Sequence, residues 1–127
     1  AFDPGAPDAL KTINKACDFN VSGVIDFVGS ETSSTLAVNL VRRAGTVVIV
    51  GLFGGEFKMP LPTFALKSIS IIGSYVGGLN ELRELVALAQ QQTLPQIPLD
   101  RRPLAQVNAA LDDLMQGRVV GRVVLQP

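Results

Sequence analysis

The residues Thr46–Gly55, TVVIVGLFGG, decide the fold class of this 127-residue chain. The run TVVIV shows no alternation of apolar and polar residues, which is typical of a parallel strand covered by helices on both faces. It ends in a turn that contains Gly51, Gly54 and Gly55. We therefore expect the central strand of a parallel α/β sheet, and the question is what the glycine-rich turn holds.

Helical and strand patterns alternate around this segment. Helical periodicity is found at residues 4–17, 31–45, 79–92 and 103–117, with a short turn at 64–67. Short apolar or β-branched runs predict strands within residues 21–30, 68–78 and 121–127. This order predicts an α/β fold, a partial doubly wound (Rossmann-type) mostly parallel sheet with flanking helices.

Local signals set expectations for individual residues. Thr32 or Ser33 is expected to cap the second helix. Arg42 and Arg43 are expected in its last turn, where cations interact favourably with the helix dipole. Cys17 has no basic neighbour to lower its pKa, so we expect an inert thiol packed on the apolar face of the first helix.

Composition narrows the class of protein. The chain is 47 % apolar and 17 % charged, as expected for a folded domain. A net charge of zero without a basic tract argues against a nucleic-acid partner, and the apolar runs are too short to cross a membrane. With one cysteine and no histidine, we expect a cytoplasmic protein with no zinc site within this chain.

The glycine turns do not match a phosphate-binding loop. Such a loop needs G-x-G-x-x-G between a strand and a helix, and the glycines of GLFGGEF and GSYVGGL have other spacings. They are either tight turns or parts of a ligand-binding edge. Because parallel strands end at one edge of a sheet, Gly29, Gly51 and Gly73 could together hold a flat, amide-bearing ring.

The charged residues offer no competing active site. Asp112 and Asp113 are adjacent on a helix, so their side chains diverge and are expected to be solvated. Lys67 and Arg102 are also expected at the surface. Arg122 begins the last strand, either as a charge that protects a sheet edge or as a guanidinium that binds phosphate.

Four segments in series carry a family resemblance. They are GVIDFVGS, AGTVVIVGLFGG, SIIGSYVGGLNEL and the close PLAQVNAALDDLMQGRVVGRVVLQP. In this order they strongly resemble the C-terminal part of zinc-dependent medium-chain alcohol dehydrogenases. The resemblance implies that residues 1–94 are the second half of a Rossmann-type NAD(P)-binding domain, and that residues 95–127 return toward a catalytic domain.

The same resemblance implies a nicotinamide half-site. Backbone groups of Val50, Ser74 and Val76 would meet the carboxamide of NAD or NADP. The ring would be flanked by Gly51, Leu52 and Tyr75. Phe27 and Val28 match the adenosine side, and Arg122 matches an arginine that reaches the pyrophosphate.

The resemblance also implies features outside this chain. They are a zinc ion, an alcohol, aldehyde or ketone substrate, and a homo-oligomer that meets through the 68–76 strand region. The isolated chain, which lacks catalytic groups, is expected to be inactive. Two alternatives stay open: a fragment of a zinc-free quinone or enoyl reductase, and a non-catalytic α/β module that binds a protein or nucleotide.

Overall fold

The computed structural model describes all residues 1–127, which form two compact units. The first unit comprises Ala1–Gly77 and the second Gly78–Pro127, and each is described by itself. The resemblance placed a boundary after residue 94, between two segments of a longer protein. These two units do not test that boundary, which stays a prediction.

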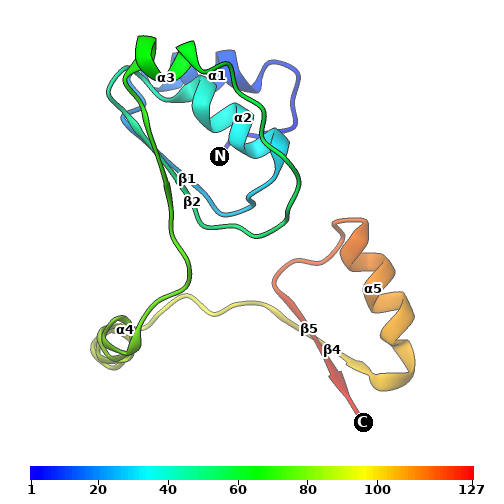
Figure 1. The fold of residues 1–127 in the computed structure, drawn as a ribbon. Coiled ribbons are helices and arrows are strands. Elements are labelled where there is room, and N and C mark those ends of the chain that lie inside the picture. Colours follow the sequence, from blue (N-terminus) through cyan, green and yellow to red (C-terminus); the bar gives the residue numbers. More distant parts are fainter. The chain divides into compact units, whose positions relative to one another are not determined.

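The first unit is built on a three-stranded parallel sheet (Figure 1). Its strands are β1 (Gly23–Asp26), β2 (Thr46–Ile49) and β3 (Ser70–Gly73), in the order β1-β2-β3. Val47 of β2 faces Val24 on one side and Ile71 on the other, and its side chain is fully buried. The TVVIV segment is therefore the central strand, and the predicted α/β fold with a parallel sheet is confirmed.

Three helices accompany this sheet, α1 (Ala9–Ala16), α2 (Glu31–Leu40) and α3 (Pro62–Lys67). Figure 1 shows α2 lying against β1 and β2, while α1 packs on α2. The buried core lies between α2 and the sheet, and consists of Ala37, Val38, Val41, Val47 and Ile69. The opposite face of the sheet is less covered, since Ile25 and Ile72 are both more than half exposed.

The ends of α2 differ from the sequence-based expectation. Its cap is Ser30, whose hydroxyl accepts a hydrogen bond from the Ser33 N–H, so capping by Thr32 or Ser33 was wrong. The helix ends at Leu40, which leaves Arg42 and Arg43 beyond its last turn. The helix ends here because the Arg42 N–H donates to the carbonyl of Val21, two residues before β1, at 2.8 Å, and not to a carbonyl of α2.

Lys67 supplies the cation that the end of α2 would otherwise lack. Its Nζ donates to the Val38 carbonyl at 2.8 Å and the Asn39 carbonyl at 3.4 Å. These carbonyls lie in the last turn of α2, where the helix dipole favours positive charge. Lys67 is thus a half-buried contact between α3 and α2, and its placement as a free surface group was wrong.

The first helix is shorter than its apolar pattern indicates. It begins at Ala9, although the expected range was residues 4–17, and it ends at Ala16. Cys17 follows the helix and is exposed, so the expectation that its thiol packs in the core was wrong. Cys17 is the residue at which the helix ends, and the next two residues, Asp18 and Phe19, have φ values of 50° and 55°, so the helical apolar face does not continue to the thiol.

The second unit contains α4 (Leu79–Gln91), β4 (Leu99–Pro103), a 3₁₀ turn η1 (Leu104–Gln106), α5 (Val107–Met115) and β5 (Arg122–Gln126). β4 and β5 form a parallel pair. β4 was not predicted from the sequence, because LDRRP contains three charged residues and stands among prolines. β4 is defined by its pairing with β5, which lies about twenty residues further along the chain.

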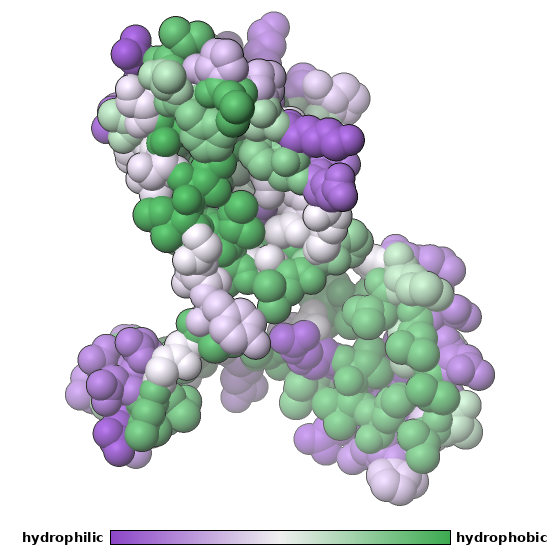
Figure 2. Space-filling model, in the orientation of Figure 1, coloured by the Kyte–Doolittle hydropathy of each residue, from purple (hydrophilic) through white to green (hydrophobic).

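Much of the apolar surface of both units is open. Figure 2 shows hydrophobic residues in green over much of the visible face. All residues of α4 are exposed, including the apolar Leu82, Leu85 and Val86. No helix in the chain combines the length and the apolar character that a membrane crossing requires.

Candidate functional site

The carboxyl ends of β1, β2 and β3 meet at one edge of the sheet, which we call the strand-end edge. Because all three strands are parallel, the residues that follow Asp26, Ile49 and Gly73 emerge together. Two links hold them in place: the Asp26 carbonyl accepts from the Val50 N–H at 2.9 Å, and the Ile49 carbonyl accepts from the Ser74 N–H at 2.9 Å. The edge therefore brings together all the predicted site residues except Arg122.

Gly29 and Gly51 make the closest backbone contact of this edge. A Cβ on Gly29 would overlap the Gly51 carbonyl, and a Cβ on Gly51 would overlap the Val28 carbonyl group. Gly29 also has a φ of +68°, where L-residues are strained. These glycines are needed for the approach of two loops to each other, whereas the open space beside Gly73 leaves room for a side chain.

Several backbone groups at the strand-end edge take part in no hydrogen bond within the chain. They include the Val50 carbonyl, the Ser74 carbonyl and the Val76 N–H. Two acceptors and one donor match the amide group of a flat ring, which offers two N–H donors and one carbonyl acceptor. Val50, Ser74 and Val76 thus each have a free backbone group at this edge, and their contact with a carboxamide stays a prediction.

Val76 has an unusual backbone conformation. Its φ is 43°, in the left-handed region that β-branched residues rarely adopt. Such a conformation costs on the order of 1–3 kcal/mol and persists only where the surrounding structure imposes it. The strain is located at the residue that carries the free N–H.

Exposed apolar side chains surround these free groups. The exposed fractions of Leu52 and Tyr75 are 77 % and 74 %, and Phe27, Val28 and Val76 are also more than half exposed. An apolar ring stacked on such side chains would gain hydrophobic stabilisation of about 25 cal/mol per Å² of apolar area buried. The edge is suited to an aromatic ring with a polar substituent.

A buried carboxylate lies directly beneath the strand-end edge. Asp26 is the last residue of β1 and only 6 % exposed. Its Oδ1 accepts from the Val28 and Gly29 N–H groups, each at 2.9 Å. Its Oδ2 accepts from the Ser33 hydroxyl at 2.8 Å and the Ser34 hydroxyl at 3.0 Å. Four donors therefore satisfy one carboxylate without a cation.

The environment of Asp26 keeps its side chain ionised. Burial by itself would raise the pKa of this carboxyl, but the hydrogen bonds from Gly29, Ser33, Val28 and Ser34 outweigh burial and hold the pKa below its ordinary value. Asp26 was not among the site residues predicted from the sequence. An acidic residue between apolar ones in GVIDFVGS, followed by the Ser33-Ser34 pair, was the available signal.

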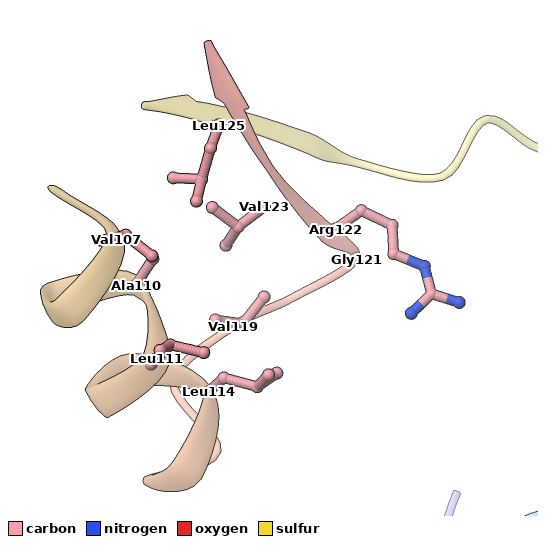
Figure 3. A pocket seen from close by; sticks show the side chains of 9 residues that line it. All are labelled: Val107, Ala110, Leu111, Leu114, Val119, Gly121, Arg122, Val123 and Leu125. Atoms are coloured by element: carbon pink, nitrogen blue, oxygen red, sulfur yellow. The ribbon is translucent and has the colours of Figure 1, made fainter. Parts of the chain in front are cut away.

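Arg122 lies in the second unit, at the start of β5. It is at the border of an apolar hollow of about 210 Å³ between α5 and β5, lined also by Leu111, Leu114, Val123 and Leu125 among others. Figure 3 shows these apolar side chains turned toward one another, whereas the Arg122 guanidinium points away from them. The hollow is lined mainly by apolar side chains, and the role of Arg122 stays a prediction.

The second unit also contains an ion-pair network centred on Asp113. Its carboxylate accepts from Arg102 at 2.7 Å and is also paired with Arg118, and these two hydrogen bonds lower its pKa. Arg102 additionally binds Asp100 at 2.7 Å. Asp113 and Arg102 are thus partly buried partners that join β4 to α5, and the expectation that both are free surface groups was wrong.

The chain itself does not fit a zinc site. No group of three or more histidine, cysteine, aspartate or glutamate side chains is close enough to hold a metal ion. The chain has one cysteine and no histidine, the side chains from which zinc sites in proteins are mostly built.

Comparison with known proteins assigns the family. The profile described as "Zinc-binding dehydrogenase" matches residues 1–91, which is most of the chain. The chain belongs to the zinc-binding dehydrogenase family. The resemblance to the C-terminal part of medium-chain alcohol dehydrogenases is thereby confirmed.

Individual relatives in this family are oxidoreductases. The chain is 32 % identical over 104 residues to an NAD-dependent alcohol dehydrogenase of Sulfurisphaera tokodaii, covering 82 % of this chain and 30 % of the relative. It is 31 % identical over 121 residues to D-arabinose 1-dehydrogenase (NADP(+)) of Saccharolobus solfataricus, covering 94 % of this chain and 34 % of the relative. The chain therefore spans about a third of the length of these relatives.

A solved structure agrees with the fold. The crystal structure of the alcohol dehydrogenase from Aeropyrum pernix has a TM-score of 0.82 and 35 % identity to this chain. The match covers 95 % of this chain and 35 % of that protein. This family member thus contains the same α/β arrangement of parallel strands and flanking helices as part of a longer protein.

Proposed function

We propose that this chain forms the nicotinamide side of the cofactor site in an NAD(P)-dependent alcohol dehydrogenase. The main support is the strand-end edge, where the Val50 carbonyl, the Ser74 carbonyl and the Val76 N–H are free of partners within the chain. A nicotinamide carboxamide has the complementary donors and acceptor. Membership in the zinc-binding dehydrogenase family supports the same cofactor class.

In this proposal each part of the edge has one task. The two carbonyls and the N–H orient the carboxamide and thereby the plane of the ring. Leu52 and Tyr75, both exposed, cover the ring and exclude water from it. When bound, the nicotinamide ring supplies the hydride donor or acceptor chemistry. Phe27 and Val28 would lie toward the adenosine part, and Arg122 would bind the pyrophosphate.

The remaining functions belong to the part of such a protein that this chain does not contain. The residues here do not fit zinc, so no step of the reaction is assigned to a metal in this chain. We propose that the substrate is an alcohol, aldehyde or ketone and that the isolated chain has no turnover. The choice between NAD and NADP stays open, because the names of the relatives include both cofactors.

We also propose that the longer protein is a homo-oligomer that meets through the 68–76 region. The supporting observation is that β3 pairs only with β2, so its other edge is available for another strand. Light scattering after size exclusion would contradict this proposal if the longer protein remained a monomer at high concentration. A cytoplasmic location remains a prediction from the cysteine content.

The test of the cofactor proposal is a titration of the ¹⁵N-labelled chain with reduced nicotinamide mononucleotide, followed by NMR. We expect saturable shifts of the amides near Val50 and Ser74–Gly77, with a Kd on the order of 1 mM because only part of the site is present. Adenosine monophosphate should not shift the NMR signals of these amides. A folded chain whose strand-end amides do not respond to the mononucleotide would contradict the proposal.

A matched pair of variants separates the strand-end edge from the rest of the surface. Leu52→Asp places a charge beside the ring and should weaken binding by about tenfold, or 1.4 kcal/mol. Leu66→Asp makes the same change at a leucine of α3 that is 70 % exposed and distant from the strand-end edge, and should have no effect. Equal weakening in both variants would indicate nonspecific charge repulsion.

A further inference from the structure

Asp26 contacts the strand-end edge through its main chain as well as its side chain. Its carbonyl accepts two hydrogen bonds, from the Val50 N–H at 2.9 Å and from the Gly51 N–H at 3.0 Å. Its carboxylate accepts four more, from Val28, Gly29, Ser33 and Ser34. These hydrogen bonds connect the end of β1 to the β1–α2 turn, the start of α2 and the β2 loop.

The Gly51 hydrogen bond determines where the Val50 carbonyl points. The Gly51 N–H and the Val50 carbonyl belong to one peptide unit, and the chain has no cis peptide bond. In a trans peptide the N–H and the carbonyl point in opposite directions. Because the N–H is directed at Asp26, the Val50 carbonyl is directed away from β1 and stays free for a ligand.

The side chain of Asp26 maintains the conformation on which this orientation depends. Oδ1 of Asp26 accepts from the Val28 N–H, so the side chain ties the start of the β1–α2 turn to the end of β1. It also holds Gly29 against Gly51, since Oδ1 accepts from the Gly29 N–H as well.

We infer that Asp26 is a positioning residue for the proposed nicotinamide site: its carboxylate holds the turn in which Gly29 packs against Gly51, while its main-chain carbonyl orients the Val50–Gly51 peptide. This inference rests on the proposed function. Asp26 does not itself touch the ligand, because it is buried beneath the strand-end edge. It acts through the Val50 carbonyl and the Gly51 N–H.

The test compares four variants of the chain, each titrated with reduced nicotinamide mononucleotide. Asp26→Ala should weaken binding by about tenfold, and should shift the Val50 carbonyl ¹³C signal because the turn that packs against Gly51 loses its anchor. Asp26→Asn keeps an oxygen acceptor for both N–H groups and should bind within about threefold of the parent chain. Ser34→Ala removes one donor to the carboxylate and should have a smaller effect than Asp26→Ala.

Val24→Ala controls for stability. Val24 lies two residues earlier on the same face of β1 and packs against the core, so its truncation destabilises the unit without altering the Asp26 hydrogen bonds. It should leave both the affinity and the Val50 carbonyl signal unchanged under conditions in which the chain is folded. Equal loss of affinity in Val24→Ala and Asp26→Ala would overturn the positioning role.

The outcomes distinguish this inference from the proposed function. If the folded parent chain does not bind the mononucleotide, the proposed function fails. If the parent binds and Asp26→Ala binds equally well, only the positioning role fails. If Asp26→Ala does not fold, Ser34→Ala decides: an unchanged Val50 carbonyl signal in that variant would overturn the inference, and a shifted signal together with weaker binding would support it.

Discussion

Asp26 in the first unit and Asp113 in the second both join separate elements of their unit, but they do so by different chemistry. Asp26 is buried and is satisfied by two backbone N–H groups and two hydroxyls. Asp113 is partly exposed and is satisfied by the guanidinium groups of Arg102 and Arg118. Neutral donors around a buried charge are insensitive to salt, whereas partly exposed ion pairs are screened by it.

The difference corresponds to the expected roles of the two units. A ligand edge needs a fixed backbone geometry, and short hydrogen bonds to a buried carboxylate provide it. The second unit has no such edge, and its network connects β4 with α5 at the surface. The first unit is therefore the place where small changes in geometry are expected to alter binding.

The largest expected effect comes from the glycine contact of the first unit. Gly29→Ala places a Cβ against the Gly51 carbonyl at a positive φ, and should destabilise the first unit by more than about 4 kcal/mol. Gly73→Ala is the matched control, because no atom lies within 4 Å of its added Cβ. Hydrogen exchange of the buried Val47 amide measures the stability of this unit. Comparable losses of stability in both variants would show that the contact between Gly29 and Gly51 does not cause the destabilisation.

A smaller effect is expected from the charge of Asp26, and it depends on pH. The folded-state pKa of Asp26 is lowered, so its stabilising contribution is present above the unfolded pKa of about 4 and is lost as the pH falls through the folded value. At pH 7, Asp26→Asn should destabilise the first unit by about 2 kcal/mol. The difference in stability between the parent chain and Asp26→Asn should narrow below pH 4. A difference that does not change with pH would mean that the negative charge of Asp26 does not cause the stabilisation.

Val76 tests whether strain at the strand-end edge is linked to ligand binding. Val76→Gly relieves the strain at a φ of 43°, and should stabilise the first unit by about 1 kcal/mol relative to Val76→Ala, which keeps a Cβ. The same glycine should weaken mononucleotide binding, because the N–H is then less constrained. Unchanged stability in Val76→Gly would show that this conformation is not strained.

The smallest effect is expected in the second unit. Asp113→Asn removes the charge that pairs with Arg102 and Arg118, and should destabilise the α5–β4 contact slightly at low salt. The loss should vanish in 1 M salt, where the Debye length is about 3 Å. The loss of stability in Asp26→Asn should be the same at these two salt concentrations. A similar salt dependence in Asp26→Asn and Asp113→Asn would contradict the proposed difference between the two carboxylates.

Part of the candidate site could be predicted from the sequence. The strands at GVID, TVVI and SIIG have compositions that specify them locally, and parallel pairing then brings their carboxyl ends together. The two loops at Val50 and Ser74 follow directly from those strand ends. The sequence could not show which backbone groups remain free, because this depends on which neighbouring donors and acceptors are hydrogen-bonded in the folded chain.

The sequence by itself determined the α/β class and the existence of the strand-end edge, because apolar periodicity and glycine positions are local properties. The tertiary structure decided what each polar group does. Asp26 is satisfied by donors up to eight residues away, Lys67 by carbonyls 28 and 29 residues away, and β4 by pairing with β5. Hydrogen bonds of this kind form only once the chain has folded, so they leave no periodic pattern in the sequence.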